Sequence, residues 1–167
     1  KGKYVYTQEL EYDVEPVYAW FNGCSFAQVP GQPVRRDEEG RVAMVLPEGR
    51  REDATAKIHP FKLHRGVLPV LTEQQWIAPI TTEELYHHGD VDNAVRDATR
   101  SLYGLEDVDF TWEETIRYMG IYHAIPPAED ALQCADCHSD TGRMDWQVLG
   151  YEADPYPMQD EDGGGAQ

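Results

Sequence analysis

The sequence lacks any long apolar run and is poor in basic residues. No stretch approaches the roughly 18 consecutive apolar residues that a membrane-spanning helix needs, so we expect no membrane span. Lys and Arg number 14 against 31 Asp and Glu, which gives a formal net charge of −17. So acidic a chain repels the phosphates of nucleic acids and of anionic membranes, and neither is an expected partner. The chain begins Lys1-Gly2-Lys3 without an apolar segment, so we expect any signal peptide to have been removed or to lie on a missing N-terminal portion.

Cysteine is scarce too, and the positions of the three cysteines narrow the chemistry. Cys134 and Cys137 stand two residues apart with His138 directly after them, whereas Cys24 lies alone far upstream. A zinc ribbon needs a second Cys/His pair, which the sequence lacks. A thioredoxin-like pair opens a helix after a βαβ pattern, and no such pattern precedes Cys134. The order Cys-x-x-Cys-His is instead the attachment motif of haem c. We therefore expect one covalent haem c per chain, bound through Cys134 and Cys137, with His138 as the proximal iron ligand.

Two other histidines are candidates for the distal side of an iron. His64 lies in the stretch 57–66, whose lysines and arginine are suited to pairing with haem propionates. His123 ends a helical pattern over 111–123, from where an imidazole can face iron. Either could serve a haem other than the one bound here, and both also fit ordinary roles at a surface or a helix end. His59 is the weaker candidate because Pro60 restricts its backbone. A thioether ligand is the alternative, available from Met119, Met144 and Met158.

The periodicity of apolar residues predicts a mainly α chain with much irregular loop. Helices are expected over 91–103, 111–123 and 128–137, the first capped by Asp90 or Asp92 and ended by Gly104. Short strands are expected only in the N-terminal part, at 4–6, 10–12, 34–35 and 42–45. We expect one haem-binding domain over 1–153, loop-rich with short strands over 1–80 and helical over 91–150. A flexible tail rich in acidic residues and glycine then follows over 154–167.

Three segments carry a likeness to a known family. They are 16–23 (PVYAWFNG), 57–66 (KIHPFKLHRG) and 123–143, which begins HAIPP and contains CADCH. They resemble the C-terminal part of the multihaem cytochromes c of the octahaem tetrathionate reductase family. The resemblance implies a multihaem-cytochrome-like fold, bis-histidine ligation and electron transfer along a row of haems, with His123 as a distal ligand, often to a haem other than that of its own motif. This chain has one haem motif where the family has eight, so the family's reductase activity is not carried over.

The motif and the resemblance together predict an electron-transfer chain or subunit that works with other haems in a larger assembly. The expected partners are other cytochrome chains or redox proteins in an oligomer or multi-subunit complex. Because haem is attached to cysteine outside the cytoplasm, the expected location is the periplasm or the cell exterior. Two alternatives stay open: part of a haem enzyme that reduces a sulfur or nitrogen oxyanion, and a module that donates a histidine to a partner's haem. Catalysis by the chain on its own is less expected than electron transfer.

Overall fold

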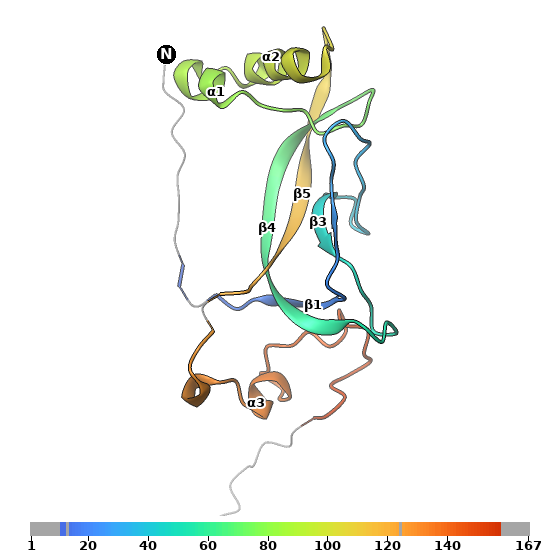
Figure 1. Cartoon of the computed structure of the whole chain (residues 1–167), viewed down its shortest axis with the longest axis vertical. Coiled ribbons are helices and arrows are strands. Elements are labelled where there is room, and N and C mark those ends of the chain that lie inside the picture. The colour runs from blue at the N-terminus through green and yellow to red at the C-terminus, as the bar shows by residue number, and fades with distance from the viewer. Residues whose placement is uncertain (1–10, 13, 124, 158–167) are drawn as a thin grey trace, which may run out of the picture. The chain divides into compact units, whose positions relative to one another are not determined.

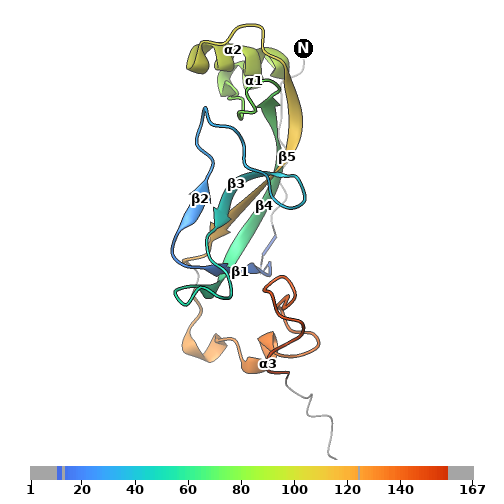
Figure 2. The same cartoon turned by 90° about the vertical axis from the view of Figure 1, so that its right-hand side faces the viewer.

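A mixed five-stranded sheet runs through the chain. The computed structural model describes residues 11–12, 14–123 and 125–157. The strands are β1 (Val17–Phe21), β2 (Ser25–Ala27), β3 (Val42–Pro47), β4 (Lys57–Leu71) and β5 (Phe110–Gly120). Their order is β1-β4-β5-β3-β2, and the long strands β4 and β5 lie side by side (Figures 1 and 2). Strand β1 pairs antiparallel with β4, Val17 opposite Phe61, while β3 pairs parallel with β5, Val42 opposite Thr115.

Helical structure is limited to short elements. These are α1 (Thr82–His88), α2 (Val91–Tyr103), the 3₁₀ turn η1 (Ala128–Asp130) and α3 (Cys134–Cys137). The expectation of a mainly α fold is therefore wrong: the fifteen-residue β4 and the eleven-residue β5 organise a mixed α/β fold. No helix in the described part of the chain is both long enough and apolar enough to cross a membrane.

One predicted helix is present with the predicted ends, and two are not. Helix α2 begins after Asp90, whose carboxylate accepts the Asn93 N–H at 3.0 Å, and it ends at Gly104 in the left-handed conformation. The helix expected over 111–123 is strand β5, because its threonines and aromatic residues favour extended structure once β3 and β4 offer hydrogen bonds on both sides. The helix expected over 128–137 breaks at Ala131, which is extended, and resumes as α3.

The strands expected near the N-terminus have mixed outcomes. Of those at 4–6 and 10–12, the structure describes only residues 11 and 12, which form no strand. The expected pair 34–35 with 42–45 is reduced to a bridge between Arg36 and Val42 and a hydrogen bond from Ala43 N–H to Arg35 O at 2.9 Å. Strand β3 pairs with β5 instead, so residues far apart in sequence replace the expected local hairpin.

The described residues form two compact units, and the long strands β4 and β5 contribute to both. The first unit contains Phe26–Leu46 and His64–Arg117, with α1, α2 and a core of buried apolar side chains. That core is made of Leu71, Ala78, Val95 and Val108. The second unit contains Val14–Ser25, Pro47–Leu63 and residues 118–157, and it holds the Cys-x-x-Cys-His motif. The domain boundaries expected from the sequence stay a prediction.

Candidate haem-attachment site

A single helical turn carries the two cysteines of the motif. Helix α3 (Cys134–Cys137) starts with a capping box, in which the Asp136 carboxylate accepts the Gln133 N–H at 2.7 Å. The His138 N–H donates to Cys134 O at 2.8 Å and closes the turn. Residues three apart on a helix face the same way, so both sulfur atoms are offered to one side. Cys134 is exposed and Cys137 half-buried, and both are free thiols.

The electrostatics of the turn keep Cys137 in the neutral thiol form. Burial raises the pKa of the Cys137 thiol, and the Asp136 carboxylate adds to the rise against the opposing charge of Arg143. Among the described residues no three His, Cys, Asp or Glu side chains gather as a metal site, so the thiols have no zinc-binding partners there. The two cysteines are thus unpaired and available for covalent chemistry.

His138 is held on three sides by the residues that follow it. The Asp154 Oδ1 atom lies 2.7 Å from the Nδ1 atom of His138. The Trp146 ring stacks on the imidazole, with centroids 4.8 Å apart and planes 18° apart, and the Tyr156 ring meets it edge-on at 5.9 Å. Because Asp154 engages Nδ1, Nε2 is the ring nitrogen left for iron.

The carboxylate of Asp154 stays charged beside this histidine. Burial opposes its ionisation, but hydrogen bonds from His138 and from the Tyr156 N–H outweigh that cost and hold the pKa of Asp154 below its usual value. No sequence pattern predicts this contact, since Asp154 lies 16 residues beyond His138 in a polar segment. The expected flexible tail begins at this residue; positions 158–167 lie outside the described residues.

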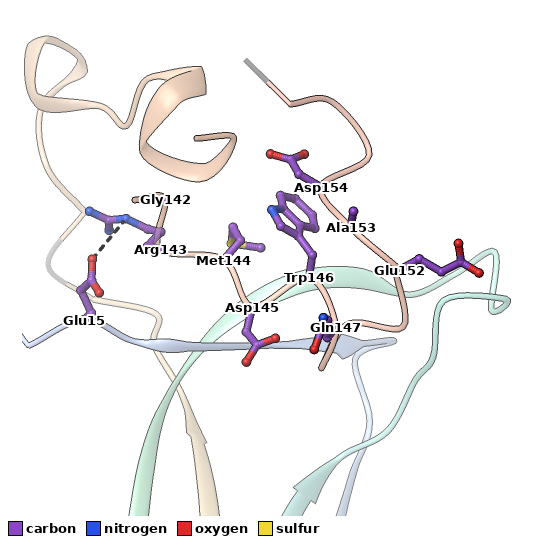
Figure 3. A pocket seen from close by; sticks show the side chains of 10 residues that line it. All are labelled: Glu15, Gly142, Arg143, Met144, Asp145, Trp146, Gln147, Glu152, Ala153 and Asp154. Atoms are coloured by element: carbon purple, nitrogen blue, oxygen red, sulfur yellow. Dashed lines mark ion pairs between the residues drawn. The ribbon is translucent and has the colours of Figure 1, made fainter. Parts of the chain in front are cut away.

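The segment after the motif folds back and lines an open pocket of about 550 Å³ (Figure 3). Arg143 anchors its start: the Arg143 N–H donates to Asp136 O at 2.9 Å, and the guanidinium forms an ion pair with Glu15 at 3.9 Å. Trp146 and Asp154, the two main partners of His138, stand on the wall of the pocket (Figure 3). Its volume is in the range of small-molecule sites in proteins.

The segment is also fixed at its far end. The buried Leu149 accepts a hydrogen bond on its carbonyl oxygen from Trp20 Nε1 at 2.9 Å. The Arg51 guanidinium donates to Gly150 O at 2.7 Å and lies 4.2 Å above the Tyr151 ring, which meets Trp146 edge-on. The position of Trp146 against His138 is therefore supported from β1 and from the loop before β4.

The candidate distal histidines lie in different surroundings. His64 is in β4, in the first unit, and its Nε2 atom is buried without a hydrogen-bond partner among the described residues. His123 is exposed just after β5, in the second unit, and makes no hydrogen bond or ring contact with any residue that the structure describes. The helix expected to present His123 is not formed. Of the candidate thioethers, Met144 lines the pocket, Met119 is exposed and Met158 lies outside the described residues.

His59, the weaker candidate on sequence grounds, lies among aromatic rings. It lies among the rings of Phe21, Phe61 and Tyr122, with centroids 5.5, 5.1 and 5.0 Å away. Its Nε2 atom is also buried and lacks a partner in the described part of the chain. A buried polar atom without a partner is uncommon in native proteins, so both nitrogens merit a functional test.

Two free thiols on one turn, followed at once by a fixed imidazole, are the donor set of a c-type cytochrome. In agreement, the family model described as bacterial cytochrome c matches residues 1–141, and the chain belongs to this family. Covalent haem c is the cofactor that the family implies, and the thiols and the free Nε2 of His138 fit it chemically.

A solved structure shows the wider relationship. The chain is similar to the octahaem cytochrome c from Shewanella oneidensis, with a TM-score of 0.76 and 30% sequence identity. The match covers 87% of this chain but 35% of that protein, so the chain spans about a third of the length of its relative. The resemblance to octahaem cytochromes stated from the sequence is thereby confirmed. No curated protein matches the sequence closely enough to count as a relative.

Proposed function

We propose that this chain carries one covalent haem c on Cys134 and Cys137, with His138 as proximal iron ligand, and transfers electrons within a larger multihaem assembly. The observation that carries the proposal is the α3 turn, which presents two free thiols and an imidazole whose Nδ1 is already engaged by Asp154. When bound, the haem supplies a one-electron Fe(III)/Fe(II) couple. Asp154 orients the imidazole of His138, and the stacked Trp146 ring shields one face of that imidazole from water.

Several features support electron transfer over catalysis. A second imidazole ligand would fill the sixth iron position and leave no site for a substrate. His123 and His64 are the proposed distal ligands, of this haem or of another one in the assembly. The proposed partners are other cytochrome chains or redox proteins, and the match to part of an octahaem cytochrome supports this choice. The proposed location is outside the cytoplasm, where haem c is attached.

The first test is the intact mass and visible spectrum of the protein from cells that attach haem c. We expect the mass of the polypeptide plus one haem and a low-spin spectrum. The double variant Cys134→Ala/Cys137→Ala should have the bare mass and no Soret band. A bare mass for the unmodified chain would overturn the proposal, and a high-spin ferric spectrum would favour the haem-enzyme alternative.

A second set of variants separates the distal candidates. His123→Ala and His64→Ala are compared with His87→Ala, which removes an exposed imidazole at the end of α1. The variant that lacks the distal ligand should convert to a high-spin spectrum, while His87→Ala should keep the low-spin one. The unpartnered Nε2 of His64, a feature that it shares with His59, is compatible with the alternative of a ligand donated to a partner's haem. In that case His64→Ala leaves this chain's own spectrum unchanged and alters the spectrum of the complex.

A further inference from the structure

The Asp154 carboxylate determines which tautomer His138 adopts. Its Oδ1 atom lies 2.7 Å from Nδ1 of His138 and also accepts the Tyr156 N–H at 2.8 Å. An oxygen that accepts a backbone N–H in this way and belongs to an ionised carboxylate has no proton to give. In the neutral imidazole, the proton therefore lies on Nδ1, and Nε2 keeps the lone pair that binds a metal. The side chain of Asp154 is well shielded, with 15% of its surface exposed.

Trp146 fixes the plane of the same ring. The stacked geometry, 4.8 Å between centroids and 18° between planes, blocks rotation of the imidazole toward the Trp146 side. Trp146 in turn meets Tyr151 edge-on at 5.6 Å, and Arg51 covers Tyr151. The imidazole is thus held by a charged hydrogen bond in its plane and by a supported aromatic ring on its face.

We propose that Asp154, assisted by Trp146, is the positioning residue of the iron ligand His138 and lowers the reduction potential of the haem. This inference rests on the proposed function, in which His138 binds the iron. A metal-bound histidine that donates its other N–H to a carboxylate is a stronger electron donor than one bonded to a neutral acceptor. The ferric state gains more from such a donor than the ferrous state, so the potential falls.

The test replaces the carboxylate with its neutral isostere. Asp154→Asn keeps the shape and an acceptor oxygen but removes the charge. We expect it to shift the Fe(III)/Fe(II) equilibrium about tenfold toward the ferrous state, which is about 59 mV for one electron. Glu152→Gln is the matched control. Glu152 lies two residues before Asp154 and its side chain lines the same pocket (Figure 3), so the variant removes the same charge from a neighbouring position. Because Glu152 is exposed, we expect Glu152→Gln to shift the Fe(III)/Fe(II) equilibrium by a factor of two or less.

Spectroelectrochemical titration of four haem-loaded proteins, the unmodified one and the variants Asp154→Asn, Asp154→Glu and Glu152→Gln, measures these shifts. A tenfold shift in Asp154→Asn alone, with Asp154→Glu close to the unmodified protein, supports the proposal. Equal potentials for Asp154→Asn and Glu152→Gln overturn it, while a full haem content in both leaves the proposed function standing. Absence of haem from the unmodified protein overturns the proposed function instead.

A second measurement needs no variant, in case Asp154→Asn does not fold. In the ferrous form the Nδ1 proton of His138 should give a resolved NMR signal that exchanges slowly with water, because the proton is held by a carboxylate with only 15% of its surface exposed. Rapid exchange of this proton would contradict a hydrogen bond to Asp154 and overturn the inference.

Discussion

Replacing Gly142 with alanine should separate the proposed haem-attachment turn, Cys134–Cys137, from the segment that folds back on it. A Cβ atom at this position would lie 2.7 Å from Cys137 O, 2.9 Å from the Cys137 carbonyl carbon and 3.0 Å from Ser139 O. Ordinary contact begins at 3.4 Å, so the shortest of these distances falls short by about 0.7 Å. All three atoms belong to the backbone and cannot rotate away. The Gly142 N–H also donates to Ser139 O at 2.9 Å, so relief of the clash distorts that turn.

The cost is that of inserting a methyl group into a closely packed region, about 1–3 kcal/mol. For a chain of this size, each kcal/mol lowers the melting temperature by about 2–4 °C, which gives about 2–12 °C in total. Because Cys137 immediately precedes His138, displacement of its carbonyl group should also move the imidazole away from Asp154. We therefore expect a change in the ligand-sensitive bands of the visible spectrum.

Thermal unfolding of the haem-loaded full chain, followed by circular dichroism and by the Soret band, provides the assay. Gly66→Ala is the matched control, because its added Cβ meets only the Thr115 hydroxyl group, at 3.3 Å. That variant should melt within about 2 °C of the unmodified protein. Equal melting temperatures and spectra for the two variants would refute the close approach of Gly142 to the turn.

Two further predictions concern the first unit. Asp37→Asn should cost about 1–2 kcal/mol at pH 7, because Asp37 accepts hydrogen bonds from the Arg41 side chain at 2.7 Å and backbone at 2.8 Å. Burial opposes ionisation of Asp37, but these bonds hold its pKa below the usual value, so the difference should vanish in urea titrations as the pH falls below about 4. Leu71→Ala in the core should cost about 2–5 kcal/mol, whereas Leu102→Ala, 60% exposed, should change the unfolding free energy little.

The sequence predicted local features well where capping residues and motifs determine them. Helix α2 has the expected ends because Asp90 and Gly104 act within one turn of the backbone. The five-residue motif that ends at His138 likewise predicted the cytochrome c family, which the match over residues 1–141 confirms. Strand β5 was mistaken for a helix because Trp112, Ile116 and Met119 fit helical spacing, and only pairing with distant strands selects the extended form.

The surroundings of His138, the candidate haem ligand, could not be predicted from the sequence either, because they also depend on contacts between residues that are distant in sequence. Asp154 and Trp146 reach His138 through a fold-back of the chain that no periodic pattern marks. The acidic and proline-rich composition around Asp154 predicted a flexible tail, yet the Asp154 carboxylate accepts a hydrogen bond from His138. Composition averages over a segment, whereas a single hydrogen bond depends on one side chain.

The hydrogen bond from Trp20 to Leu149 joins residues 129 positions apart and has a consequence for the order of folding. Closing so long a loop costs more chain entropy than forming a local turn, and contacts of this separation form slowly. We therefore expect the C-terminal segment to dock late, after the strands have paired. The turn that carries Cys134 and Cys137 would then stay open to solvent until the last stage of folding, when the C-terminal segment packs beside His138.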